Sequence, residues 1–280
     1  IYERRTSDIL IGGSRGDPAF LGVDELPLEN GGELGRRGWE LQLKWRDQLA
    51  SGLSDNVGLS LSDYRAKVTK DPSNLKKNLG DRTYPGMYVG EIWGYETGGI
   101  LQKEDFELDA QGNLVLNGTS PIYHGPVFNN EKVYPGYLWY HDLNGDGIIT
   151  DGDNTADNPG DKRIIGNSTP RYRYSINLGL QYKGFDLDML FQGVGKRDYW
   201  VEDTEMYWGK GAGSWDYYNN SWMPDRTNTK YPMYGAEIAG RKQTGYLLDA
   251  SYLSLRQVIL GYSLPKSLIS KAKLNKVRLH

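Results

Sequence analysis

The chain contains no cysteine, which excludes disulfide bonds and metal sites built on thiolates. It also contains no run of about 18 apolar residues, so no transmembrane helix is expected. The formal net charge of −3 provides no broad basic surface, which argues against a nucleic-acid partner. The first residues, Ile1 to Arg5, lack the zones of a signal peptide. We therefore expect either an intracellular chain or a mature or internal piece of a longer one, and favour the piece.

Phenylalanine is scarce, with 5 Phe against 21 Tyr and 8 Trp. Rings that carry a polar group suit positions between apolar and wet surroundings, such as membrane interfaces and sugar-binding surfaces. The low mean hydropathy would normally favour a soluble protein. A β-barrel is an exception, because only alternate strand residues touch lipid and long loops add polar mass.

Alternation of apolar and polar side chains is the strongest pattern. It covers residues 39–46 and 57–62, and it is clearest at 171–194, where Lys183 and Gly184 form a tight turn. The apolar positions of this last stretch are Tyr172, Tyr174, Ile176, Leu178, Leu180, Tyr182, Phe185, Leu187, Met189 and Phe191. The pattern predicts a β-hairpin with strands of about ten residues, long enough to span a bilayer when tilted.

The opposite face of this hairpin is expected to line a water-filled lumen. It carries Arg173, Asn177, Gln181, Asp186 and Asp188. Alternation alone fits a sheet in a soluble sandwich about equally well. The unbroken series of large apolar residues, set against charged and amide residues, favours the barrel.

Further strands are expected at 1–11 and 276–280, and a strand pair at 249–264. The alternation in 249–264 changes phase near Arg256 and Gln257, which indicates either a β-bulge or a different register.

Connection lengths support an up-and-down arrangement, because long and short connections alternate. The long ones, at about 70–170 and 195–248, are expected to be extracellular loops, as is 12–36. The fold class is therefore all-β: an antiparallel up-and-down transmembrane β-barrel, of which about seven strands are present. Since so few strands cannot close a bacterial barrel and an open edge is not viable in lipid, further strands of the same polypeptide are expected.

Residues 142–153 match the spacing of a calcium-binding loop. The expected ligands are Asp142, Asn144, Asp146, the Ile148 carbonyl and Asp153. Oxygen ligands in flexible geometry select Ca²⁺ over Mg²⁺. Prolines and glycines bracket the loop in place of helices, and position 12 is Asp instead of Glu, so a structural ion is expected and a calcium switch is not. The alternative is a turn rich in Asp and Asn without metal.

Residues 199–222 are crowded with aromatic rings, which stack well on sugars and peptides. The candidate substrate-binding residues are Trp200, Tyr207, Trp208, Trp215, Tyr217 and Trp222. The alternative is that these rings pack the loop against itself and the barrel mouth. No nucleophile, phosphate-loop or zinc-protease motif is present, so no catalytic residue is assigned and the protein is not expected to be an enzyme.

Several segments together resemble the SusC/RagA-type TonB-dependent outer-membrane transporters, in that family's order. These segments are Glu33–Leu41, Gly90–Tyr95, Pro135–Gly136 with the Asp142 loop, Arg163–Pro170, Tyr182–Gly193, Ser221–Trp222 with Lys230–Pro232, and Tyr252–Pro265. Each piece alone is weak, but the joint match covers most of the chain and is specific.

This resemblance implies that residues 1–280 are part of one barrel domain of about 22 strands, whose plug and final strands are not in the sequence. It implies import of oligosaccharides, or less often peptides, across the bacterial outer membrane, with a SusD-like surface lipoprotein as lid. Energy would come from the TonB complex through the plug. The alternative function is a secreted calcium-stabilised glycan-binding module, and a glycan hydrolase has no specific support.

Overall fold

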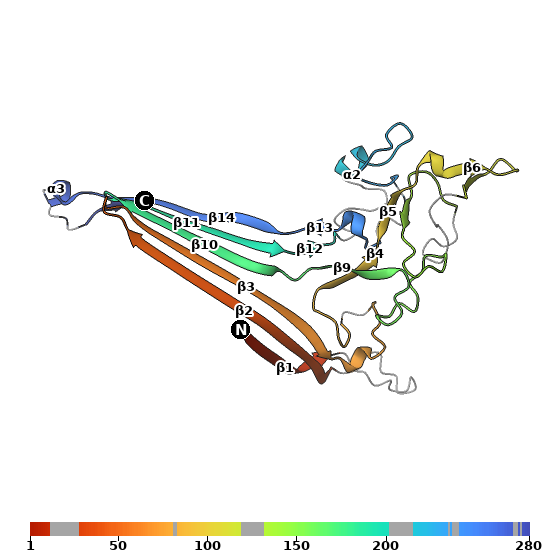
Figure 1. The fold of residues 1–280 in the computed structure, drawn as a ribbon, viewed down its shortest axis with the longest axis horizontal. Helices are drawn as coiled ribbons and strands as arrows, with labels where there is room; N and C mark the ends of the chain where they lie inside the picture. The colour runs from red at the N-terminus through yellow and green to blue at the C-terminus, as the bar shows by residue number, and fades with distance from the viewer. Residues whose placement is uncertain are drawn as a thin grey trace.

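The computed structural model describes residues 1–11, 28–80, 83–118, 132–201, 215–234, 236, 241–270, 274 and 276–280. It has two parts, a long antiparallel sheet and a group of short strands and loops at one end of that sheet (Figure 1). We call the second part the loop unit; it comprises the described residues of 71–170 and 197–251. None of the helices in the described ranges has the length and apolarity needed to cross a membrane.

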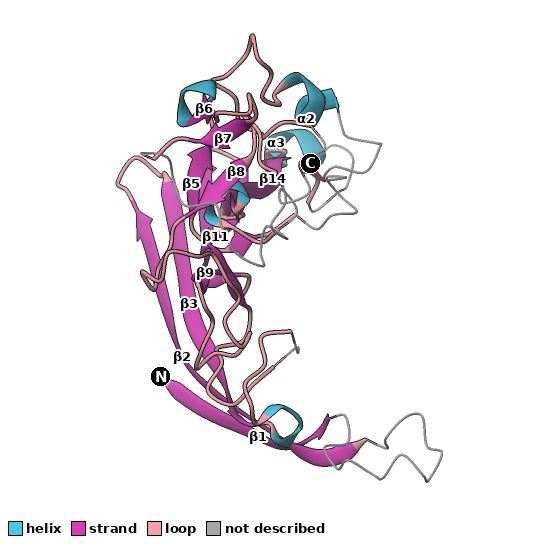
Figure 2. Ribbon diagram, turned by 90° about the vertical axis from the view of Figure 1, so that its right-hand side faces the viewer, coloured by secondary structure: helices cyan, strands magenta, loops and turns pink. Residues whose placement is uncertain are grey.

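The long sheet has seven strands in the order β1-β2-β3-β10-β11-β14-β15, each antiparallel to its neighbours. Their bounds are β1 Tyr2–Ile11, β2 Glu29–Gln48, β3 Ser54–Lys70, β10 Arg171–Tyr182, β11 Phe185–Lys196, β14 Tyr252–Ser263 and β15 Arg278–Leu279. The sheet is curved, as Figure 2 shows for β1 to β3. The expected all-β antiparallel sheet of about seven strands is confirmed.

The register of the sheet brings the alternating patterns of separate strands into line. Trp45 pairs with Val57, Val57 with Leu178, Leu178 with Met189, and Met189 with Val258. Directly paired residues project to the same face of a sheet, so one face is apolar across five strands. The predicted hairpin is present, and its turn has positive φ at both Lys183 (48°) and Gly184 (89°), which matches the twist of the strands.

Two strand expectations are corrected by the structure. Residues 249–264 contain one long strand, β14, and not a pair; a bulge leaves Arg256 without a partner between the pairs Leu190–Gln257 and Phe191–Leu255. This bulge explains the change of phase, and it returns Leu253 and Leu255 to the apolar face. In addition, β2 begins at Glu29, inside the expected loop 12–36, because its first residues pair with β1 on one side and β3 on the other.

The loop unit is built from short elements. Its strands are β4 Glu91–Tyr95, β5 Thr97–Ile100, β6 Phe106–Leu108, β7 Leu114–Leu116, β8 Leu138–Tyr140, β9 Lys162–Asn167, β12 Asp198–Tyr199 and β13 Leu248–Asp249, and its helical turns are η2 Pro72–Asn74, η3 Lys103–Asp105, α2 Trp215–Asn219 and η6 Thr244–Tyr246. They pair as β4–β9, β5–β8, β6–β7 and β12–β13. The other helix, α3 Lys266–Ile269, lies at the opposite end of the long sheet (Figure 1).

A hydrophobic core holds the loop unit together. Its buried members are Tyr95, Leu101, Phe106, Leu138, Tyr140, Ile149, Trp200, Tyr217, Tyr231 and Tyr246. Six of the ten come from the connection between β3 and β10, and four from the connection between β11 and β14. The two long connections therefore fold together as one body.

Gly136 is a point at which this packing can be tested. Its φ is 95°, and an added Cβ would lie 2.6 Å from the Trp222 ring and 2.8 Å from Met233 Cβ. We expect Gly136→Ala to destabilise the loop unit by about 2 kcal/mol, through backbone strain and overpacking. The measurement is the denaturation midpoint of the purified receptor, followed by tryptophan fluorescence.

A matched control for this change is Gly112→Ala. Gly112 has φ 79° but open space around its Cβ position, so only the conformational cost of about 1 kcal/mol applies. Equal effects of the two changes would show that the contact with Trp222 contributes nothing.

Candidate membrane-facing and ligand-facing surfaces

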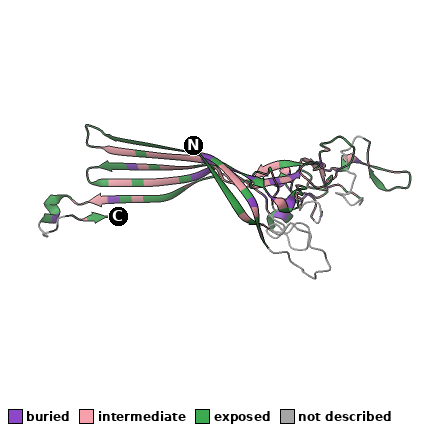
Figure 3. Ribbon diagram, turned by 90° about the horizontal axis from the view of Figure 1, so that it is seen from below, coloured by how far each residue is buried: buried purple, intermediate pink, exposed green. Residues whose placement is uncertain are grey.

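The apolar face of the long sheet is exposed in this chain. We call it the apolar band; its residues are Leu41, Leu43, Trp45, Val57, Leu59, Leu61, Ile176, Leu178, Leu180, Leu187, Met189, Phe191, Leu253, Leu255, Val258 and Leu260. Trp45 and Leu260 are each 63 % exposed, and none of the band's residues is buried. In Figure 3, most of the long sheet is accordingly coloured as intermediate or exposed. A face this large and apolar must be covered by lipid or protein.

Aromatic rings mark both ends of the apolar band. At the short-turn end, Tyr182 pairs with Phe185 and Phe185 with Tyr262, with 4.4 Å between the Phe185 and Tyr262 ring centroids. At the other end, Tyr174 and Trp39 lie on the apolar face by register, and the Tyr174 hydroxyl donates to the backbone carbonyl of Tyr252 at 3.3 Å. Girdles of amphipathic rings at the two edges of an apolar band are typical of strands that cross a bilayer.

The opposite face of the sheet is polar along its length. Paired rows on this face include Gln42–Ser60–Ser175–Gln192 and Gln48–Ser54–Gln181–Asp186. The expected lumen residues Arg173, Asn177, Gln181, Asp186 and Asp188 all lie on this side by register.

Toward the loop unit, this polar face carries a cluster of two arginines around one tyrosine. The Arg36 guanidinium lies 4.3 Å from the Tyr64 ring centroid, and an Arg173 nitrogen donates to the Tyr64 hydroxyl at 3.3 Å. Stacking of this kind holds both guanidinium groups in place and leaves their positive charge available.

The expected calcium loop has its oxygen atoms bound to its own backbone. The Asp142 carboxylate accepts hydrogen bonds from the N–H groups of Gly145 (2.6 Å) and Gly147 (2.9 Å), and these bonds hold the pKa of Asp142 below its usual range. Asn144 and Asp146 bond to each other, with 2.9 Å between Asn144 Nδ2 and Asp146 Oδ2. The loop is thus shaped as a tight turn, with positive φ at Gly145 and Gly147.

Sequence reasoning missed the residue that anchors this loop. Asp161 is fully buried and lies outside the calcium spacing, and its carboxylate accepts from the Leu143 and Thr150 N–H groups at 2.8 and 2.7 Å. Asp153 instead accepts from Asn158 Nδ2 at 2.9 Å. Within the described ranges, no three acidic or imidazole side chains gather closely enough to form a metal site. Binding of calcium by the expected ligands would therefore require the hydrogen bonds of Asp142, Asn144, Asp146 and Asp153 to rearrange.

The candidate substrate-binding rings fall into separate environments. Trp200, Tyr217 and Trp222 are buried, and burial raises the pKa of the Tyr217 hydroxyl to about 12. Trp215, at the start of α2, is 80 % exposed. Tyr207 and Trp208 lie outside the described residues. Of the four candidate rings that the structure describes, Trp215 alone offers a large surface to a ligand.

The geometry defines a class of protein. An antiparallel up-and-down sheet with an apolar outer face, aromatic edges, a polar inner face and one elaborate end is the wall of an outer-membrane β-barrel. The comparisons with known proteins give the family: the chain is part of a TonB-dependent receptor barrel. The resemblance to the SusC/RagA type is matched in fold by the RagAB structures. Such receptors are outer-membrane proteins, which gives the location.

The curated relatives are TonB-dependent receptors of Formosa agariphila. TonB-dependent receptor P3 is 30 % identical over 294 residues, covering 100 % of this chain and 26 % of its own length. TonB-dependent receptor P26 is 23 % identical, covering 94 % of this chain and 25 % of its own length. The chain thus spans about a quarter of the length of the curated relatives it matches. These relatives are receptors, not enzymes. No family model matches the chain.

Solved structures share the fold. The RagAB peptide importer in its open-open state matches with a TM-score of 0.67 and 21 % identity, covering 99 % of this chain and 27 % of that one. In its closed-closed state the TM-score is 0.61, again at 21 % identity, covering 99 % and 28 %.

Proposed function

We propose that the protein imports oligosaccharides or peptides across the outer membrane in a TonB-dependent manner, as the SusC-like barrel of a two-component complex. The observation that carries this proposal is the two-faced sheet, with a continuous polar face that runs from the short turns up to the loop unit. Further strands of the whole receptor would close this wall around a lumen. A secreted glycan-binding module is not favoured, since its fold would not leave the apolar band exposed.

The partners follow from the same arrangement. We propose that the loop unit faces the cell surface and supports a SusD-like lipoprotein lid, as two proteins act together in the RagAB importer. The TonB complex would act through a plug in the remainder of the receptor. The rigid core shared by the two long connections gives such a lid a single body to bind.

The test is uptake by bacteria with and without the receptor gene. Fluorescent oligosaccharide and peptide mixtures are supplied as sole carbon or nitrogen source, with and without an uncoupler that removes the energy for TonB. We expect receptor-dependent, uncoupler-sensitive uptake of one class. Uptake that is equal in the deletion strain for both classes would contradict the proposal.

Trp215 is our candidate for ligand contact, since its exposed ring stands on the loop unit near Tyr218. We expect Trp215→Ala to weaken binding of the imported ligand roughly fivefold, the equivalent of about 1 kcal/mol of ring contact. Isothermal titration calorimetry on the purified complex measures this. Leu268→Ala is the control, because Leu268 is also exposed but lies on α3 at the opposite end of the sheet. An unchanged affinity of the Trp215 variant would remove this residue from the ligand site.

Calcium remains a proposal for the loop at 142–153. We expect one Ca²⁺ to bind Asp142, Asn144, Asp146, the Ile148 carbonyl and Asp153, and to stabilise the folded receptor by about 2.7 kcal/mol at a hundredfold excess over its dissociation constant. Metal analysis and melting curves with and without chelator measure this. The Asp142→Asn/Asp146→Asn variant should melt at the same temperature with and without chelator. A chelator that leaves the wild-type melting curve unchanged would reject calcium here.

A further inference from the structure

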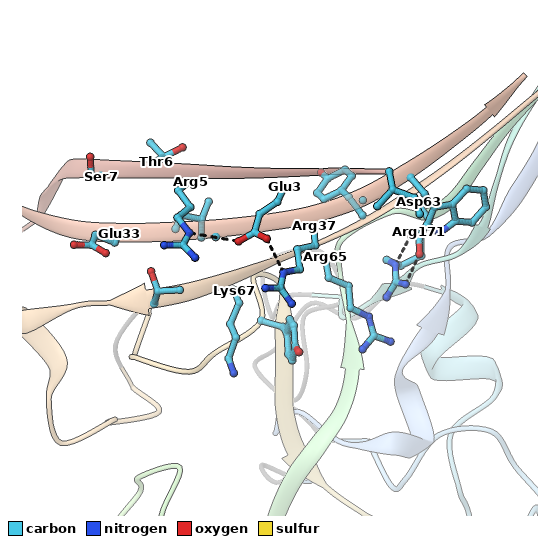
Figure 4. Close-up of a pocket in the computed structure, with 18 residues that line it drawn as sticks. Glu3, Arg5, Thr6, Ser7, Glu33, Arg37, Asp63, Arg65, Lys67 and Arg171 are labelled. Carbon is cyan, nitrogen blue, oxygen red and sulfur yellow. Dashed lines mark hydrogen bonds and ion pairs between the residues drawn. The ribbon is translucent and has the colours of Figure 1, made fainter.

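Positive charge follows directly beyond the apolar band on the outward face of β1, β2 and β3. In the register, Arg37 pairs with Glu3 and Arg65, while Gly35 pairs with Arg5 and Lys67. No bulge interrupts β2 and β3 between these pairs and the pairs of the apolar band. Because residues two apart on a strand share a face, Arg37, Arg65 and Lys67 project to the same side as Leu41 and Leu61. Figure 4 shows the side chains of Arg5, Arg37, Arg65 and Lys67 on one side of the strands.

These cations are available to a ligand. The side chains of Arg5 and Arg37 are 84 % and 79 % exposed, and Arg65 and Lys67 are also exposed. Ala66 and Val68, which alternate with them on β3 and project to the opposite side, are each only 6 % exposed. Other parts of the chain therefore cover the inward face of β3 at this point, while the outward face, which carries the cations, is exposed to solvent.

The charges on this patch are not balanced. Glu3 lies between two arginines, 3.4 Å from Arg5 Nε and 3.3 Å from Arg37 Nε, so one carboxylate faces two guanidinium groups. Within the part of the chain that the structure describes, Arg65 and Lys67 have no carboxylate partner, and both lie 5.6 Å from the Tyr88 ring centroid. The patch borders a hollow of ≈ 940 Å³. Glu33, at its far end, lies 4.0 Å from Lys70 and is balanced by it.

We propose that this patch, formed by Arg5, Arg37, Arg65 and Lys67, binds the phosphate groups of a membrane lipid headgroup. Arg37 stands two residues beyond Trp39, a rise of roughly 7 Å along the strand. The headgroup layer of a bilayer is about 5–7 Å deep on each side, so Arg37 and its partner Arg65 lie at its level. Arg5 and Lys67 pair with Gly35, one row further out, and their long side chains can reach back toward the same layer. Guanidinium groups bind phosphate oxygens in a bidentate manner, and basic clusters at this depth attract anionic lipids. The inference rests on the proposed function, which puts the loop unit at the cell surface and hence assigns the lipid to the outer leaflet.

The chain contains a matched control for this patch. Arg4 and Arg36 pair directly with each other on the same two strands, one residue away from Arg5 and Arg37, but they project to the polar face. Arg5→Gln/Arg37→Gln and Arg4→Gln/Arg36→Gln therefore remove equal charge at equal height from opposite sides of the wall. The experiment is native mass spectrometry of the whole receptor, purified in detergent and titrated with bisphosphorylated lipid A, with phosphate-free lipid A, and with inorganic phosphate.

We expect the receptor to retain bisphosphorylated lipid A and to release the phosphate-free form. The outward double variant should bind roughly tenfold to thirtyfold more weakly, and the inward double variant like the wild type. Equal loss in both double variants would overturn the site as a general charge effect. Displacement of the lipid by millimolar inorganic phosphate would identify a free-anion site and would also overturn it. A receptor that imports its ligand but retains no lipid overturns this inference alone, whereas retained lipid without import overturns the proposed function alone.

Discussion

Leu178→Arg is expected to reduce the stability of the membrane-inserted receptor by about 2–4 kcal/mol, the effect of an arginine at the bilayer midplane on a lipid-facing strand position. Leu178 belongs to the middle row of the apolar band, between Val57 on one side and Met189 on the other. On β10 the apolar positions continue in both directions from Leu178, to Tyr174 toward one end of the strand and to Tyr182 at the other. An arginine here can reach neither headgroup layer without bending the wall or thinning the bilayer.

The neighbouring position is the control for this prediction. Asn177→Arg adds the same side chain one residue away, on the polar face opposite Gly58 and Leu190. Because that side chain projects into the wet interior, we expect a change of no more than about 0.5 kcal/mol. The measurement is the heat-dependent shift in gel mobility of the receptor refolded into lipid vesicles over a urea series. Similar losses for both variants would show that the two faces are not lipid and water.

The fold of the long sheet could be predicted from local sequence, because period two is visible without knowledge of distant partners. The turn at Lys183 and Gly184 is an example, since two alternating segments joined by a two-residue connection can form only an antiparallel hairpin. The strand at 252–263 is harder to predict, because its bulge at Arg256 changes the phase and breaks one pattern into two. The start of β2 is not predictable in this way, because Gly31, Gly32 and Gly35 carry no side chain with which to display alternation.

The loop unit could not be predicted in this way. Its core joins residues far apart in sequence, such as Tyr140 and Tyr246, which come from different connections. Burial of Trp200, Tyr217 and Trp222 depends on these distant partners, so composition alone could not separate a ring that packs from a ring that binds. Asp161 illustrates the same limit, since its role as the anchor of the 142–153 loop follows from two backbone N–H groups and from no motif.

A buried ion pair lies where the wall meets the loop unit. Arg171, the first residue of β10, donates from two nitrogens to the two carboxylate oxygens of Asp63, and the side chains are only 17 % and 7 % exposed. Up to Ser62, β3 pairs with β10; beyond Asp63, Lys67 forms a bridge with Tyr88 instead. The pair therefore lies at the point where β3 changes its neighbouring segment; we call this point the fork. It also holds Tyr172, whose φ is 52° and whose N–H donates to Asp63 Oδ1 at 3.4 Å.

Asp63→Leu is accordingly expected to destabilise the receptor by about 3 kcal/mol, because it leaves the Arg171 guanidinium desolvated and without its bidentate partner. Loosening should concentrate at the fork, seen as faster amide hydrogen exchange at residues 84–95 and 163–172. The double variant Asp63→Leu/Arg171→Met replaces both charges with apolar groups of similar volume, and we expect it to recover most of the loss. If the double variant is as unstable as the single one, the fork depends on the packing or the backbone hydrogen bonds of Asp63, and its charge pair is not what joins the wall to the loop unit.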